Sequence, residues 1–332
     1  MIGDWEIQKM ADEISRLKAE SVAIQFPDGL RKRMVNVVLE LKKKVDVDVY
    51  LWGDPCYGAC DVADAPADLI FHLGHAPLPH IESERVVYME LPSELPETDI
   101  LERAIPLLGE KVGLISSVQY VPELLRVRQF LASKGVAGMI GEGDSRISYP
   151  GQVLGCNFSS ARSIADDVDV FLYIGGGNFH PIGVALATGK KVIVLDPERD
   201  EVRDVEDVVD EMKRLRFAAM EKARSAGVFG VIVSRKIGQE RLRLADSIER
   251  LLGEKGKKAV TIMLDYVTPE NLMGLAVDAF VSTACPRIAI DDQARFDRPI
   301  LTQSELRIVL GELEWENYSF DEIIESDSFN SA

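Results

Sequence analysis

Four cysteines are the residues of this 332-residue chain best suited to chemistry: Cys56, Cys60, Cys156 and Cys285. They are too few for a disulfide scaffold, so each is a core residue, a metal ligand or a nucleophile. The last three are spread along the chain, and their spacing matches no local zinc or ferredoxin motif. Any site that they share must therefore be assembled by the fold.

The elements that would position these cysteines repeat three times along the chain. Short runs rich in β-branched and aromatic residues alternate with helical stretches, a pattern typical of parallel sheets with crossover helices. The expected strands are 22–26, 47–52, 68–73 and 86–90 in the first repeat, 112–116, 137–140, 170–174 and 192–196 in the second, and 228–234, 258–264, 279–283 and 299–302 in the third.

We therefore predict an α/β fold of three similar parallel-sheet units around a pseudo-threefold axis, spanning residues 1–106, 107–222 and 223–332. The charged stretch 198–224 is expected to be a helix or helix pair that joins the second unit to the third. The third unit ends in an acidic tail from residue 305, of which 326–332 are expected to be disordered. A two-domain arrangement is the alternative.

The cysteines all fall in loops that follow expected strands. Ligands of open parallel sheets bind beyond the carboxyl ends of the strands, where such loops gather. Because Cys60, Cys156 and Cys285 come from different units, their thiols can meet near the axis. Three thiolates and an open position suit a [4Fe–4S] cluster whose fourth iron binds a substrate. A closed zinc site would need a fourth ligand, such as Cys56 or a histidine, and buried reduced thiols are the simplest alternative.

The loops also carry distinctive motifs. Residues 25–30 read Gln-Phe-Pro-Asp-Gly-Leu, 54–61 read Asp-Pro-Cys-Tyr-Gly-Ala-Cys-Asp, 74–75 read Gly-His, and 285–287 read Cys-Pro-Arg. Together they resemble the diphthamide synthases of the archaeal type, and the likeness extends over nearly the whole chain. The chain lacks the local Cys-x-x-x-Cys-x-x-Cys run of ordinary radical S-adenosylmethionine enzymes, as this family does.

The resemblance implies an enzyme and its cofactor. Members of the family are homodimers of three-domain subunits, each with one [4Fe–4S] cluster whose ligands match Cys60, Cys156 and Cys285. An electron donor reduces the cluster, and the reduced cluster cleaves the bond from sulfur to Cγ in S-adenosylmethionine. The 3-amino-3-carboxypropyl group is transferred to a histidine of translation elongation factor 2, the first step of diphthamide synthesis, and methylthioadenosine is released. No catalytic residue beyond the cluster is expected.

Loop residues near the expected strand ends are candidates for binding S-adenosylmethionine. A glycine run could offer backbone N–H groups to the substrate carboxylate, although a tight turn explains it equally well. An arginine close to a proposed ligand could pair with the carboxylate, with a salt bridge to Asp291 or Asp292 as the alternative. The candidates are Gly175, Gly176, Gly177, His180, Arg235, Gln239 and Arg287.

Composition excludes some other functions. A net charge of −17 argues against nucleic-acid binding as the main role. No stretch approaches the ~20 apolar residues that cross a bilayer, and no signal peptide is apparent, so we expect a cytoplasmic protein without membrane contact. Two rival functions are a quinolinate synthase, which also combines three α/β domains with a cluster, and a non-enzymatic scaffold subunit with a structural zinc.

Overall fold

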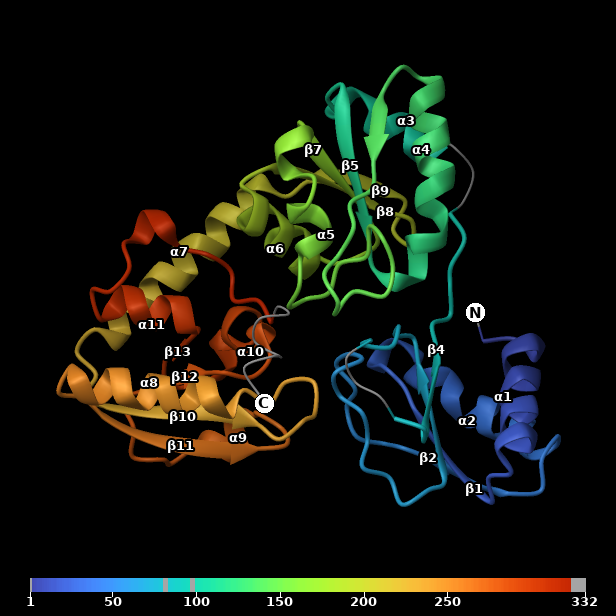
Figure 1. The fold of residues 1–332 in the computed structure, drawn as a ribbon, viewed down its shortest axis with the longest axis horizontal. Coiled ribbons are helices and arrows are strands. Elements are labelled where there is room, and N and C mark those ends of the chain that lie inside the picture. Colours follow the sequence, from blue (N-terminus) through green and yellow to red (C-terminus); the bar gives the residue numbers. More distant parts are fainter. Residues whose placement is uncertain (1, 80–82, 96–98, 324–332) are drawn as a thin grey trace.

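Three separate sheets organise the chain in the computed structural model, which describes residues 2–79, 83–95 and 99–323. Figure 1 shows them as three lobes, with the first in blue, the second in green and the third in orange and red. The strands are β1 (Ser21–Gln25), β2 (Asp48–Leu51), β3 (Leu69–Leu73), β4 (Val86–Met89), β5 (Lys111–Ser116), β6 (Ala137–Met139), β7 (Val170–Ile174), β8 (Lys191–Asp196), β9 (Glu201–Asp204), β10 (Val228–Ser234), β11 (Lys258–Leu264), β12 (Ala279–Ser282) and β13 (Ile300–Leu301).

The three sheets repeat one strand order. They run β2-β1-β3-β4, β6-β5-β7-β8-β9 and β11-β10-β12-β13, so the first strand of each unit is flanked by the second and the third. All pairs are parallel except that of β9 with β8. In this order the connections diverge beside the first strand, which opens a space at the carboxyl ends of the strands. The predicted α/β fold with three parallel sheets is confirmed.

Helices cover the sheets and complete the cores. They are α1 (Asp4–Leu17), α2 (Arg31–Lys42), α3 (Asp99–Ala104), α4 (Leu124–Ser133), α5 (Ser159–Arg162), α6 (Phe179–Thr188), α7 (Glu206–Ala223), α8 (Leu242–Glu254), α9 (Pro269–Leu272), α10 (Pro286–Ile290) and α11 (Gln303–Val309). In β7, Phe171 and Tyr173 pack into one core with α6, while Leu172 and Ile174 pack into another with α3 and α4. This alternation buries both faces of the sheet. Among the described helices, none is both long and apolar enough to cross a membrane.

The stretch 198–224 differs from the prediction, because it holds a strand as well as a helix. Glu201–Asp204 forms β9, an antiparallel edge strand beside β8, and α7 follows it. The strand is short and charged, as edge strands often are, so its sequence lacks the apolar pattern of a buried strand. Helix α7 contributes Met212 to the core of the second unit and Met220 to that of the third. The predicted boundary at residue 222 thus falls within α7, and the domain boundaries stay predictions.

The acidic tail is folded as far as residue 323. Helix α11 begins with a capping box in which Thr302 and Glu305 exchange hydrogen bonds. Beyond it, the Phe320 ring packs 5.4 Å from Phe158 and 5.7 Å from Phe179, both in the second unit. The tail therefore crosses from the third unit to the second. The stretch 326–332, expected to be disordered, lies outside the described residues.

Candidate functional site

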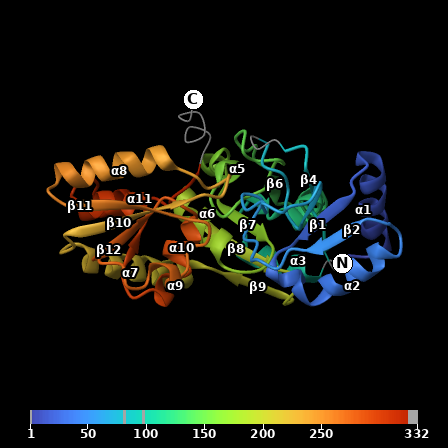
Figure 2. The same cartoon turned by 90° about the horizontal axis from the view of Figure 1, so that it is seen from below.

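Cys60, Cys156 and Cys285 influence one another electrostatically, although each comes from a different sheet unit. Burial raises the pKa of all three thiols, that of Cys285 to about 12. The charge of Cys60 raises the pKa of Cys156 and Cys285 further, and the charge of Cys285 raises that of Cys156. Such mutual charge effects favour a site that the three thiols share. Figure 2 draws α10, which follows Cys285, near α6 of the second unit, and the Arg287 guanidinium at the start of α10 lies 5.0 Å from the centre of the Phe179 ring at the start of α6.

The Cys156 loop is held by the C-terminal tail. The Ile323 backbone N–H donates to the Cys156 carbonyl at 2.7 Å, and Asn157 Nδ2 donates to both carboxylate oxygens of Asp144 at 3.0 and 3.1 Å. The Phe158 N–H donates to Glu322 Oε1 at 2.8 Å. These bonds fix a loop that has little regular structure of its own.

The Cys285 loop is held by Arg241, a buried residue just before α8. Its Nε donates to the Thr283 carbonyl at 2.6 Å, and its Nη2 donates to the Ala284 carbonyl at 3.1 Å. The same guanidinium pairs with Asp321 of the tail at 2.8 Å. Arg241 thus links the segment before Cys285 to the segment that holds Cys156.

Each thiol also has a cation nearby. Against the larger effect of burial, Arg146 and Arg241 lower the pKa of Cys156, and Arg287 lowers that of Cys285 through its backbone N–H and its charge. Lys236 lowers the pKa of Cys60, although Asp61 raises it more. Cysteine binds metals as the thiolate, so nearby cations favour the ligating form. The site suits a group that needs several thiolates at once.

Cys56 points toward two histidines instead. Its Sγ lies 3.8 Å from His72 Nε2, and His72 Nε2 lies 2.9 Å from His75 Nδ1. These three atoms lie within 4.8 Å of one another, as metal ligands can. However, two nitrogens at ~2.0 Å from a tetrahedral zinc stand more than 3 Å apart, so 2.9 Å is the separation of a hydrogen bond.

The hydrogen bonds of Gln25 determine how these histidines are protonated. Gln25 Nε2 donates to the Asp61 carbonyl at 2.6 Å, so its Oε1 accepts from the Ala63 N–H at 3.0 Å and from His72 Nδ1 at 2.9 Å. Neutral His72 therefore carries its proton on Nδ1, and its bare Nε2 accepts from His75. Burial holds the pKa of His72 at about 3 and that of His75 at about 4, so both are neutral at pH 7.

The family of the chain follows from its sequence and from this arrangement. A family model described as "Putative diphthamide synthesis protein" matches residues 26–319. The chain belongs to the diphthamide synthesis family. The predicted family is confirmed, and quinolinate synthase is no longer needed as an alternative.

Relatives in the diphthamide synthesis family match over almost their full length. The 2-(3-amino-3-carboxypropyl)histidine synthase of Pyrococcus horikoshii is 38% identical, over 98% of this chain and 95% of the relative. That of Methanocaldococcus jannaschii is 29% identical, over 97% and 94%. The crystal structure of Dph2 from Pyrococcus horikoshii with a 4Fe-4S cluster has a TM-score of 0.88 at 36% identity, covering 98% of this chain and 95% of that one. The predicted enzyme class and the fold are therefore confirmed.

The structure of this diphthamide synthesis family member brings His180 and Arg287 to one place. Burial, together with the nearby charges of Arg287 and His75, lowers the pKa of His180 to about 4. The Arg287 guanidinium lies 5.0 Å from the centre of the Phe179 ring and pairs with Asp291 at 2.9 Å. The salt bridge proposed as the alternative for Arg287 is thus present, while the residue still contacts the start of α6, which carries His180.

The other candidates for substrate binding lie in three different situations. Arg235 is exposed and pairs with Asp265 at 2.5 Å, and no described contact joins it to the cysteines. Gln239 instead contacts one of the three cysteines, with its Nε2 3.2 Å from Cys60 Sγ. In the glycine run, Gly175 and Gly177 have φ of 141° and 78°, and the Gly175 N–H already donates to Leu195 at 2.9 Å. The run is thus required by the turn into α6.

Sequence reasoning missed the buried polar residues that hold the site, above all Gln25, His72 and Arg241. Gln25 and His72 are 1% and 0% exposed, inside strands that are otherwise apolar. A polar residue near the carboxyl end of a buried strand was the available signal, since such residues are seldom buried without a partner. Nothing in the sequence indicated that Arg241 is buried, because an arginine just before a helix ordinarily lies on the surface.

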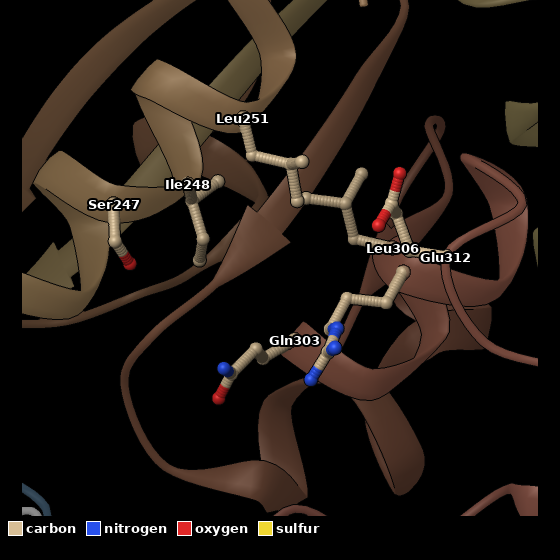
Figure 3. Close-up of a pocket in the computed structure, with 7 residues that line it drawn as sticks. Ser247, Ile248, Leu251, Gln303, Leu306 and Glu312 are labelled. Carbon is tan, nitrogen blue, oxygen red and sulfur yellow. The ribbon is translucent and has the colours of Figure 1, made fainter. Parts of the chain in front are cut away.

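One surface cavity lies away from this site. It has a volume of about 270 Å³ and lies between α8 and α11 of the third unit, as Figure 3 shows. Its lining residues are Ser247, Ile248, Leu251, Gln303, Leu306, Arg307 and Glu312. None of them was a candidate site residue.

Proposed function

We propose that Cys60, Cys156 and Cys285 hold one [4Fe–4S] cluster, and that the enzyme transfers the 3-amino-3-carboxypropyl group of S-adenosylmethionine to a histidine of elongation factor 2. The observation that carries the proposal is the mutual electrostatic effect of three thiols, one from each sheet unit, together with the approach of Gln239 of the third unit to within 3.2 Å of Cys60 Sγ of the first. The crystal structure of Dph2 from Pyrococcus horikoshii with a 4Fe-4S cluster supports the proposal.

The donor set fits a cluster better than it fits a closed zinc site. Three thiolates leave one of four irons without a protein ligand, which a substrate can then occupy. A structural zinc would need a fourth ligand, and the remaining cysteine, Cys56, contacts His72 and the Asp61 carbonyl instead. When bound and reduced, the cluster supplies the electron that cleaves the bond from sulfur to Cγ.

Residues of the second and third units are candidates for binding the carboxylate and the ammonium of S-adenosylmethionine. Arg287 is close enough to Cys285 to lower the pKa of that thiol, and it pairs with Asp291. Its guanidinium can also pair with the substrate carboxylate. Neutral His180 can accept a hydrogen bond from the substrate ammonium. The N–H groups of Gly176 and Gly177 are further candidates for the carboxylate.

The physiological setting belongs to the same proposal. A homodimer, an electron donor that reduces the cluster and a cytoplasmic location agree with the family resemblance. Elongation factor 2 is the proposed protein substrate, because the names of the relatives specify a modified histidine.

The test is transfer by the anaerobically reconstituted full chain. With dithionite and S-adenosylmethionine, we expect elongation factor 2 to gain the aminocarboxypropyl group and methylthioadenosine to be released. Cys60→Ala, Cys156→Ala and Cys285→Ala should each abolish transfer and lower the iron content, whereas the matched variant Cys56→Ala should retain iron. Release of 5′-deoxyadenosine, or zinc without iron in the purified protein, would contradict the proposal.

A further inference from the structure

The Cys60 loop of the first unit is held by one short segment of the third, residues 236–239. Lys236 Nζ pairs with Asp61 Oδ2 at 2.6 Å, and the Gly238 N–H donates to the Cys60 carbonyl at 3.3 Å. Gln239 Nε2 then donates to Cys60 Sγ itself at 3.2 Å. The segment follows β10, the strand beside the opening of the third sheet.

The bond from Gln239 to sulfur is sheltered from water. Gln239 is 5% exposed, so its amide donates to Cys60 Sγ from within the protein interior. In the described part of the chain, no other side chain donates a recorded hydrogen bond to a proposed ligand sulfur. Cys60 therefore has a donor that a side-chain substitution can remove.

The charge of Lys236 acts on Cys60 less strongly than the opposite charge of its partner Asp61 does. Its ammonium pairs with Asp61 and lies over two aromatic rings, 4.2 Å from the centre of Tyr266 and 5.3 Å from that of Tyr57. The neutral amide of Gln239 is thus the group in direct contact with the sulfur.

We propose that Gln239 is a positioning residue that raises the reduction potential of the cluster through its N–H···S bond to Cys60, an inference that rests on the proposed function. Reduction adds negative charge to the cluster and its thiolates, so a donor to a ligand sulfur stabilises the reduced form more than the oxidised form. Gln239 therefore makes the cluster easier to reduce, and the third unit tunes a ligand of the first.

The experiment is a redox titration of the reconstituted full chain, followed by electron paramagnetic resonance, with iron and sulfide content measured on each sample. Gln239→Leu and Gln239→Met remove the N–H donor and replace the amide side chain with an apolar one of similar size. Gln119→Leu is the matched control, because Gln119 also bridges two units, donating to the Gly74 carbonyl at 2.5 Å, but bonds no sulfur.

We expect both Gln239 variants to keep their iron and to have a more negative midpoint potential than Gln119→Leu. At the midpoint of the unaltered enzyme, their ratio of reduced to oxidised cluster should fall several-fold, a tenfold fall being about 59 mV for one electron. Equal potentials in all variants would overturn the inference, as would loss of iron from both Gln239 variants, which would make Gln239 a requirement for holding the cluster. Absence of iron from the unaltered chain would instead refute the proposed function itself.

Discussion

Replacing Arg216 with methionine should destabilise the enzyme more than any exposed ion-pair substitution. Arg216 lies on α7 between the second and third units, and its side chain is 1% exposed. It pairs with the fully buried Glu305 through two bonds of 2.7 and 2.6 Å. Its remaining N–H groups donate to the Ala289 carbonyl at 2.5 Å and the Ile300 carbonyl at 2.6 Å.

The magnitude follows from what Arg216→Met leaves behind. Removing one partner of a buried ion pair costs ~3–5 kcal/mol, because the other charge stays buried without compensation. Glu305 keeps its bonds from the Thr302 N–H at 2.8 Å and from Tyr318 at 3.3 Å, which limits the loss. We expect a fall of ~4 kcal/mol in the free energy of unfolding of the third unit. The double variant Arg216→Met with Glu305→Gln should lose less than the single one, since no charge is then buried.

Urea unfolding followed by circular dichroism measures both effects. Arg16→Met is the matched control, because Arg16 pairs with Glu13 on the surface, and it should cost less than ~1 kcal/mol. A loss below ~1.5 kcal/mol for Arg216→Met, or a double variant as unstable as the single one, would refute the reasoning. Since Ala289 lies in α10 next to Cys285, we also expect Arg216→Met to retain less iron after reconstitution.

Three further predictions test the supports of the site. In the unfolded chain, histidines become protonated below about pH 6.5, whereas in the folded chain His75 and His180 do so only near pH 4 and His72 only near pH 3. As the pH falls between these values, the free energy of unfolding should therefore fall by up to ~1.4 kcal/mol per pH unit for each of the three histidines. Unfolding curves at several pH values should show a shallower slope for His180→Gln, and an unchanged slope would contradict the assignment. Gly183→Ala would place Cβ 2.1 Å from the Phe158 ring and should lower the free energy of unfolding by ~1–3 kcal/mol, while Gly253→Ala, with open space around it, should not. Ending the chain after Asn317 removes the segment that bonds the Cys156 loop, so iron content after reconstitution should fall, and full iron retention would show that the tail is dispensable.

The strands were predictable because their chemistry is local. Each buried strand is an apolar run, and the twelve parallel strands fall where the pattern places them, to within one or two residues at most ends. The missed strand β9 has no such run, because it lies at the edge of the sheet and pairs with β8 on one side only. Local pattern thus predicted the sheets and failed where a neighbouring strand supplies the stability.

The site was only partly predictable, because its supports are long-range contacts. The cysteines were identified from their equivalent places in repeated units. Arg235 and Gln239 follow the same strand and are alike as sequence signals, yet one pairs with Asp265 at the surface and the other reaches Cys60. The direction in which each side chain leaves the loop depends on the packing of the first unit against the third, which no local pattern encodes.

Each cysteine loop is fixed by a part of the chain that lies far from it in sequence. Segment 236–239 holds Cys60, the tail up to Ile323 holds Cys156, and Arg241 joins the Cys285 loop to that tail. A single sheet unit therefore contributes one thiol but lacks the contacts that orient it. Without a metal, burial disfavours the thiolate forms, and neighbouring thiolates repel one another. Both effects raise the pKa values of Cys156 and Cys285. The cations and inter-unit bonds offset that cost, so binding of the metal group and docking of the three units should stabilise each other.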